Sequence, residues 1–267
     1  MIVARRQLAD RRVNVMFWAV GMVATVAFVV LLYPSIEGKA GFKRMVEQLP
    51  SAIKAIIGSN EKYSIISPEG YLHGRLFTTL GPMLLTIFGI GLGASCIAGD
   101  EGEGTLELLL ANPVSRRRVA GQRYLVLVAL VLFLAAVAAV TTVVLAALIG
   151  GSMGRLSAAH IIEAMFGSAC LALLHASVAF AIGCMIGKRS VAVAAAAVVA
   201  IAGWLMQVIT ASVPDLHWLA AISPWRWYMR EMIIVTGLNA TATLLPLVLC
   251  AICAVAGIAV FERRDLR

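Results

Sequence analysis

Long runs of apolar residues, separated by short polar stretches, dominate the chain. A helix that crosses a membrane needs about 20 predominantly apolar residues. Six runs reach this length, at about 13–33, 76–99, 124–150, 161–187, 191–213 and 241–261. Backbone polar groups in hydrocarbon must find hydrogen-bond partners within the segment, so each run is predicted to be a helix. The pattern therefore predicts an all-α polytopic membrane protein, with a single transmembrane domain over 1–267.

The composition excludes an ordinary soluble fold. Of the 267 residues, 61% are hydrophobic and 13% are charged, and the mean hydropathy is +0.93. A soluble domain carries about 25% charged residues, which this chain does not approach. The net charge is +8, but the basic residues stand in short clusters beside the apolar runs. Such clusters are typical of orientation signals, so we expect contact with the lipid bilayer and no binding of nucleic acid.

The positions of lysine and arginine predict the orientation of the chain. Six spans place both termini on one side, and the short connections of that side carry most of the positive charge. The basic residues on this side are Arg5, Arg6, Arg11, Arg12, Arg116, Arg117, Arg118, Arg123, Lys188, Arg189, Arg263, Arg264 and Arg267. On the other side, most basic residues fall in one longer loop, at 34–75, among acidic residues. Basic short connections stay in the cytoplasm, so we expect both termini there and the protein in the cell membrane.

Three segments outside the spans have patterns of their own. Residues 1–12 alternate apolar and basic residues, which suits an amphipathic helix at the membrane interface, although a charged leader fits equally. In the outer loop, 34–75, apolar residues recur at helical spacing around Pro50, and 67–70 look like a turn into the second span. The connection 214–240 contains Trp225, Trp227 and Tyr228, which favour the lipid–water boundary. We expect an interfacial or re-entrant segment there, with an anchoring role favoured over contact with a substrate.

The loop at 100–123 differs in character from its apolar surroundings. Acidic residues come first, leucines follow at helical spacing, and a basic run begins at Ser115. Pro113 ends the helical pattern, because the residue before a proline avoids the α region. Thr105 is a candidate cap for the helix, and nearby acids are favoured at its N-terminus. We predict a short amphipathic helix parallel to the membrane, while a solvated loop with orienting arginines remains an alternative.

Three motifs along the chain share features with one known family. The first comprises the acidic cluster, the sequence GTLELLL at 104–110 and the sequence PVSR at 113–116, and it resembles the cytoplasmic loop of the ABC-2 type permeases, the membrane subunits of ATP-binding-cassette exporters. Ser223-Pro224-Trp225 with Tyr228 resembles its motif before the last span, and FERRDLR at 261–267 resembles its characteristic ending. The length and the six spans fit as well. The long outer loop followed by SPEGYL at 67–72 is similar to permeases that export antibiotics and other lipophilic compounds.

The resemblance implies a division of labour between subunits. Two permease copies, identical or different, would each dock on a cytoplasmic ATPase subunit, which would hold the ATP and Mg, while this chain would carry no cofactor and no catalytic residue. The loop would be the coupling helix. The coupling residues implied are Asp100, Glu101, Glu103, Gly104, Thr105, Leu106, Glu107, Leu108, Leu109, Pro113 and Arg116. Gly102 interrupts the consecutive acids of many members, which leaves the charge pairing with the ATPase open.

The sequence offers no motif for ATP hydrolysis or for a metal ion. A phosphate-binding loop requires Gly-x4-Gly-Lys-Ser/Thr after a strand, and the nearest stretch, GCMIGKR at 183–189, has the wrong spacing and lies at a helix end. The pair Cys250-x-x-Cys253 lies within the last span and has no second pair of ligands nearby. We expect packed thiols there, with no metal site and no disulfide framework.

Ionisable residues within membrane spans are functional candidates by default, and here they are few. His175 and Gln207 are candidates for a substrate path, although hydrogen bonding between helices is the favoured role. No relay of carboxylates and histidines appears, which weighs against an ion-coupled carrier. The acids at 100–103 lack histidine partners, which weighs against an integral-membrane enzyme. The prediction is a permease that moves a lipophilic antibiotic, drug or lipid out of the cytoplasm or inner leaflet.

The coupling prediction can be tested at Glu103 and Glu107. Replacing both with lysine should uncouple ATP hydrolysis from transport, because the charge offered to the ATPase is reversed, while insertion into the membrane stays intact. Transport per ATP in reconstituted vesicles is the measurement. Unaltered transport by the double variant would remove these two acids from the docking role.

Overall fold

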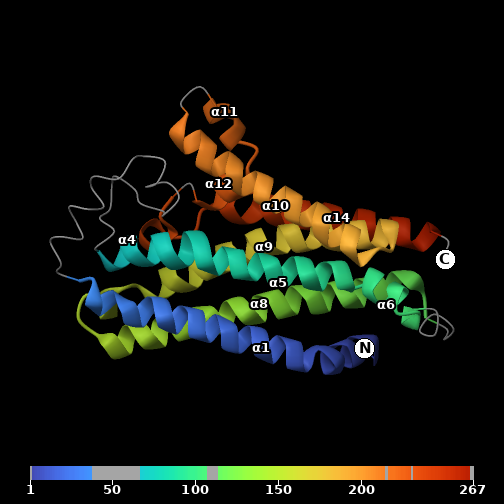
Figure 1. Cartoon of the computed structure of the whole chain (residues 1–267), viewed down its shortest axis with the longest axis horizontal. Helices are drawn as coiled ribbons and strands as arrows, with labels where there is room; N and C mark the ends of the chain where they lie inside the picture. Colours follow the sequence, from blue (N-terminus) through green and yellow to red (C-terminus); the bar gives the residue numbers. More distant parts are fainter. Residues whose placement is uncertain (1, 38–66, 107–113, 214–215, 230, 265–267) are drawn as a thin grey trace.

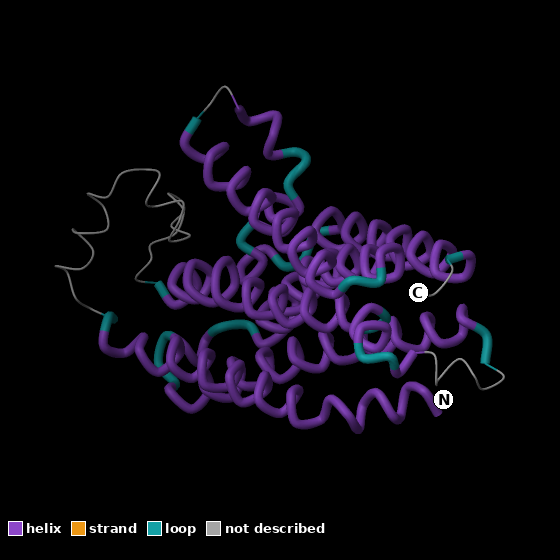
Figure 2. Tube along the Cα trace, turned by 45° about the vertical axis from the view of Figure 1, so that its right-hand side comes forward, coloured by secondary structure: helices purple, strands orange, loops and turns teal. Residues whose placement is uncertain are grey.

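The computed structural model describes residues 2–37, 67–106, 114–213, 216–229 and 231–264. Every regular element within these ranges is helical, and six helical segments are long and apolar enough to cross a membrane. They run side by side as one elongated bundle (Figures 1 and 2). The prediction of an all-α polytopic membrane protein is therefore confirmed.

The first, third and fourth spans are single continuous helices. They are α1 (Ile2–Leu32), α8 (Arg116–Ile149) and α9 (Ala158–Ile186). The short 3-10 helices η1 (Tyr33–Ser35) and η3 (Met153–Arg155) follow α1 and α8. The fifth and sixth spans are α10 (Arg189–Ser212) and α14 (Ala240–Arg263), and α11 (His217–Ala220), α12 (Pro224–Met229) and α13 (Ile233–Thr236) lie between them. Both ends of the chain lie at the same end of the bundle, which we call the termini end (Figure 1).

The N-terminal segment differs from its prediction. Instead of a separate interfacial helix over 1–12 followed by a span, the structure has one uninterrupted helix, α1. The reason is local, because neither glycine nor proline stands near Arg12 and Val13, where a break would have to form. The basic residues of this segment therefore extend the first span beyond its apolar part.

The second span begins earlier than predicted. It consists of α4 (Pro68–Leu72), the π-helical η2 (His73–Leu80) and α5 (Gly81–Ser95) in direct succession. Ser67 caps its start by accepting a hydrogen bond from the Gly70 N–H at 3.1 Å, and Pro68 occupies the first turn. Residues 67–70 are thus a helix start rather than a turn, since serine before proline is a strong N-terminal signal.

The π-helical stretch frees one carbonyl group for another element. The Gly81 N–H donates to Leu76 O, five residues back, and Pro82 has no N–H to offer. The Phe77 carbonyl is left available, and the Tyr228 hydroxyl of α12 donates to it at 2.7 Å. This bond attaches the segment before the last span to the second span.

α9 is the central helix of the bundle. Of its apolar window 78% is buried, against 22% for the windows of α1 and α10. It packs against α5, α8, α10 and α14, whereas α1 packs mainly on α8. The peripheral helices present large apolar side chains outward, such as Phe17, Leu205 and Val255, as expected for surfaces in lipid.

Small residues set the closest approach between α5 and α9. A Cβ atom on Gly89 would lie 3.1 Å from the Cβ of Ala176, and one on Gly93 would collide with the Ala176 carbonyl oxygen. On the other side of α9, a Cβ on Gly257 of α14 would lie 2.9 Å from the Cα of Ala181. Without a strong hydrophobic force between helices in lipid, such close packing holds the bundle together.

We predict opposite outcomes for two glycines of α5. Gly93→Ala should lower the free energy of unfolding by about 1–3 kcal/mol, because the new methyl group pushes against backbone that cannot move aside. Gly91→Ala is the matched control, because nothing lies within 4 Å of its added Cβ. Thermal melting in detergent measures both. Equal melting temperatures for the two variants would contradict the packing described here.

Candidate functional site at the termini end

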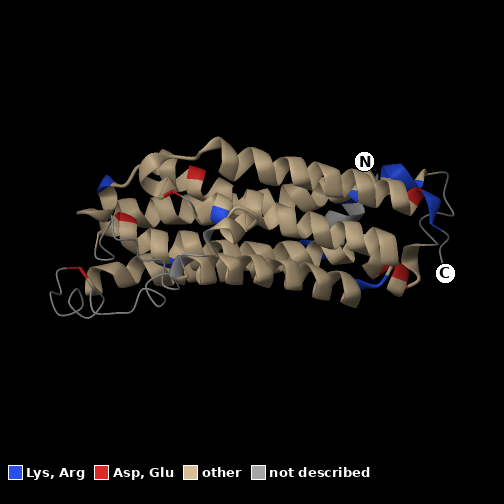
Figure 3. Ribbon diagram, turned by 90° about the horizontal axis from the view of Figure 1, so that it is seen from above, with Lys and Arg blue, Asp and Glu red and all other residues tan. Residues whose placement is uncertain are grey.

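The loop after the second span folds against the termini end of the bundle. α6 (Ala98–Gly102) follows α5 after a short turn and lies beside the start of α8 and the end of α14 (Figure 1). Charged residues gather toward the two ends of the bundle and leave most of its length apolar (Figure 3). The termini end combines acids from α6 with arginines from several helices, and it contains the predicted coupling loop.

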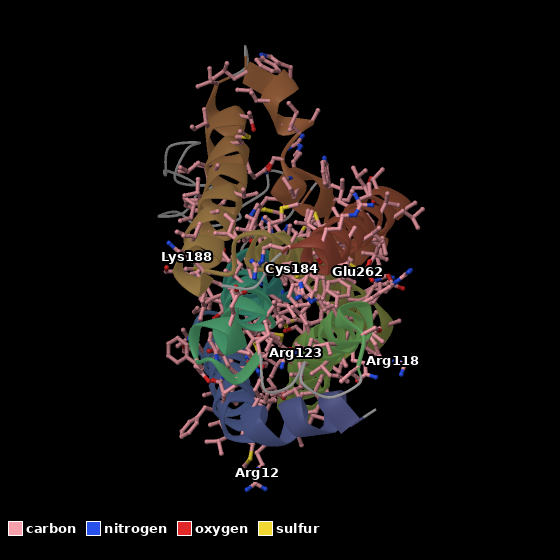
Figure 4. All side chains as sticks on the ribbon, turned by 90° about the vertical axis from the view of Figure 1, so that its right-hand side faces the viewer. Arg12, Arg118, Arg123, Cys184, Lys188 and Glu262 are labelled. Atoms are coloured by element: carbon pink, nitrogen blue, oxygen red, sulfur yellow. The ribbon has the colours of Figure 1, made fainter. Side chains whose placement is uncertain are left out.

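Asp100 is paired within the chain. Its carboxylate forms an ion pair with the guanidinium of Arg123, two turns into α8, and the two side chains are 26% and 7% exposed. Arg123 also donates to the carbonyl of Cys96, the residue that closes α5. Figure 4 shows Arg123 inside the ring of helices, whereas Arg118 of the same helix points outward. The guanidinium therefore satisfies both a helix end and the acid of the next helix.

Glu101 is paired with a different part of the chain. It forms an ion pair with Arg264, which follows α14, and the two side chains are 15% and 16% exposed. The backbone carbonyl of Arg264 accepts a hydrogen bond from the Arg116 guanidinium at the start of α8. That guanidinium also lies over the ring of the buried Phe261, 6.0 Å from its centroid. The ends of α6, α8 and α14 are thus joined by one set of contacts.

Glu101 also lies against the turn between α9 and α10. Gly187 ends α9 with φ of +72°, and a Cβ at this position would lie 2.5 Å from the Glu101 carboxylate oxygens. Glycine is therefore required at position 187 for two reasons: the backbone is left-handed, and the carboxylate of Glu101 occupies the space that a side chain would need. This close fit places α6 against the turn between α9 and α10, in addition to its contacts with α8 and α14.

Arg11 of α1 completes the end of the second span. Its guanidinium donates to the Ser95 hydroxyl at 2.7 Å and to the Ser95 carbonyl at 3.2 Å. The last carbonyls of a helix have no partner within it, and cations are favoured there by the helix dipole. Arginines from the first and third spans therefore cap the second span from two sides.

The remaining predicted coupling residues divide by exposure. Glu103, Gly104 and Thr105 are exposed, with φ of +68° at Gly104, and the Thr105 hydroxyl donates to the Asp100 carbonyl at 3.3 Å. Leu106 is buried at 1% exposure and belongs to the main core. Glu107, Leu108, Leu109 and Pro113 lie outside the described residues. Of the three acids Asp100, Glu101 and Glu103, only Glu103 is exposed.

The two candidates for a substrate path lie deeper in the bundle. His175 of α9 is fully buried, its Nδ1 lies 2.9 Å from the Leu171 carbonyl, and its Nε2 has no hydrogen-bond partner. Gln207 of α10 is half-buried, and its Oε1 also has no partner. Neither side chain forms a hydrogen bond between helices among the described residues, and the roles proposed for both stay predictions.

The segment before the last span is anchored through three polar side chains. The Ser223 hydroxyl donates to Gly203 O at 2.7 Å, and the Trp225 indole donates to Ala200 O at 3.1 Å, both on α10. The Tyr228 hydroxyl lies 2.7 Å from the Ser168 hydroxyl of α9. Burial raises the pKa of the Tyr228 phenol, which keeps it a neutral hydrogen-bonding group. These contacts attach α12 to the bundle and bury the Trp225 and Tyr228 rings among its helices, whereas the sequence predicted them at the lipid–water boundary.

No group of three or more histidine, cysteine, aspartate or glutamate side chains among the described residues has the arrangement of a metal site. The five cysteines are free thiols, with Cys250 buried and Cys253 half-buried. The motif Cys250-x-x-Cys253 therefore forms no disulfide within the chain.

The fold and this end of the bundle define a class of protein. Six helices long and apolar enough to cross a membrane make it a multi-pass membrane protein. A model of the family described as "ABC-2 family transporter protein" matches residues 1–266, and the chain belongs to this family. It is therefore the permease subunit of a transporter whose family works with an ATP-binding-cassette ATPase in a membrane complex. No curated protein matches the sequence.

Sequence reasoning did not single out Arg123 and Arg264. In the sequence both count only as orienting charges, because a basic residue beside an apolar run is usual in membrane proteins. Their partners stand 23 and 163 residues away in the sequence. The sequence does show acidic residues on the same predicted side of the membrane as the arginines. It does not indicate which acid pairs with which arginine.

We predict that Arg123 contributes far more to stability than its neighbour Arg118. Arg123→Met should lower the free energy of unfolding by about 3 kcal/mol, because Asp100 keeps its charge without a partner. Arg118→Met should change it by less than about 0.5 kcal/mol, because this side chain is exposed. Unfolding in detergent compares the two. Similar losses in both variants would contradict the buried pairing.

Proposed function

We propose that this chain is the permease of an exporter in the cell membrane, with the termini end in the cytoplasm and a docked ATPase driving transport. The observation that carries the proposal is the position of the loop after the second span. It leaves the bundle at the termini end, exposes Glu103 and Thr105, and is tied to the third and sixth spans through Asp100 and Glu101. An ATPase that holds this loop holds several spans at once.

The orientation follows from where the free basic residues lie. Exposed positive side chains at the termini end include Arg12, Arg117, Arg118, Lys188 and Arg189. Three of those labelled in Figure 4, Arg12, Arg118 and Lys188, lie at the periphery of this end. Such residues face the cytoplasm in membrane proteins. A cytoplasmic termini end is also the one that an ATPase can reach.

The residues exposed beyond α6 are suited to docking. Since Asp100 and Glu101 are engaged inside the permease, we assign the contact with the ATPase to Glu103, Gly104 and Thr105. Leu106, which follows them, is buried in the core and attaches this segment to the bundle. A force that the ATPase applies to this loop would then be transmitted directly to the helix bundle.

The interior of the bundle suits a lipophilic cargo. The polar side chains described within the spans are mostly neutral and hydrogen-bonded inside the bundle, such as Tyr124, whose hydroxyl lies 2.7 Å from that of Ser177 and donates to Cys250 O at 3.4 Å. A charged cargo would need countercharges at depth. A lipophilic antibiotic, drug or lipid needs none, and a second permease copy would complete the path.

We expect the purified chain to show no ATPase activity and to co-purify with an ATP-binding-cassette subunit from its native host. In proteoliposomes, efflux of a lipophilic fluorescent dye should require that subunit, Mg and ATP, because the permease lacks a phosphate-binding loop. The control is a partner with its phosphate-binding lysine replaced. Dye export by the permease alone, without nucleotide, would contradict the proposed function.

A further inference from the structure

Two adjacent acids of α6 connect it to two different spans. Successive residues of a helix point about 100° apart, so Asp100 and Glu101 reach different neighbours. Asp100 pairs with Arg123 of α8, and Glu101 pairs with Arg264 at the end of α14. A helix of five residues is thereby held between the third and sixth spans, on the path from the docking loop to the membrane.

These pairs resist separation because they are sheltered from water. The four side chains are between 7% and 26% exposed, so an acid that lost its arginine would remain charged in a poorly hydrated place. The Arg123 guanidinium also donates to Cys96 O, and the main chain of Arg264 is held by a hydrogen bond from the Arg116 guanidinium to its carbonyl. α6 therefore moves relative to α8 and α14 only if sheltered charges come apart.

We propose that Arg123 and Arg264 are positioning residues for the transport cycle, which carry the displacement of the docking loop to the third and sixth spans. This inference rests on the proposed function, because it requires that an ATPase moves the loop. It gives the ending of the chain a defined role. The side chain of Arg264, just after the last span, pairs with Glu101 of α6, and its carbonyl accepts a hydrogen bond from Arg116 at the start of α8.

The Glu101–Arg264 pair allows a test by charge reversal. Glu101→Lys and Arg264→Glu each place like charges together, whereas the double variant restores an attractive pair with opposite polarity. The contact from Arg116 uses the backbone carbonyl of Arg264, so the exchange leaves it in place. Arg264→Gln is a milder variant that removes the charge and keeps a polar side chain, in case the reversed single variants fail to fold.

The measurement is the movement at the far ends of the spans when the ATPase is trapped with Mg-ATP and vanadate. Labels introduced as non-natural amino acids replace Leu148 of α8 and Leu244 of α14, which are 76% and 61% exposed. The complete complex in vesicles carries one labelled permease copy. We expect a change in label distance in the wild type, a change at least about fivefold smaller in each single variant, and recovery in the double variant.

The matched control is Arg263→Glu, which reverses the charge next to Arg264. Arg263 is exposed and forms no ion pair within the described part of the chain, so its variant should behave as wild type. All variants should retain the ATPase on purification. Single variants that move like the wild type would overturn the inference, as would single-variant losses that the double variant does not recover. A wild-type complex that fails to form, or forms without movement, defeats the proposed function itself.

Discussion

A helix that ends near the edge of the hydrocarbon leaves its last carbonyl groups without partners, in a place that water reaches poorly. At the termini end of this bundle, arginine side chains supply those partners. Arg11 serves Ser95, Arg123 serves Cys96, and Arg116 serves Arg264. Because each guanidinium offers several donors in one plane, Arg123 binds the carbonyl and still pairs with Asp100. Arg123 therefore completes the end of the second span and connects α8 to α6 at the same time.

The two ends of the bundle are built by different chemistry. The termini end is joined by ion pairs sheltered from water, with the exposed residues Glu103 and Thr105 beside them. At the opposite end, neutral groups such as Ser223, Trp225 and Tyr228 donate to backbone carbonyls. Between them, the tight contact of Gly93 with Ala176 lets α5 and α9 behave as a unit. A displacement produced at the charged end would thus be carried along stiff helices to the opposite end.

The six spans were predictable because apolar length is a local property, and the observed helices include nearly all of each predicted run. The errors fell where polar residues continue a helix. The second span begins at Pro68 rather than at 76, and the third at Arg116 rather than at 124, since capping by Ser67 and Ser115 starts each helix outside the apolar part. The charged loop between the second and third spans was also predictable, but the contacts of its acids were not. The loop was identified, yet the pairing of Glu101 with Arg264 depends on how distant helices pack, which periodicity does not encode.

The central claim is that the loop beside α6 faces the cytoplasm and is held there by an ATPase. A photo-cross-linking amino acid at Glu103, activated in living cells, tests it most directly, with the same group at Glu37 of the opposite end as the control. The account predicts an adduct between the permease and its ATP-binding-cassette subunit from Glu103, and none from Glu37. It would be contradicted if Glu103 gave no such adduct and a cysteine at that position reacted with a membrane-impermeant reagent added outside the cell.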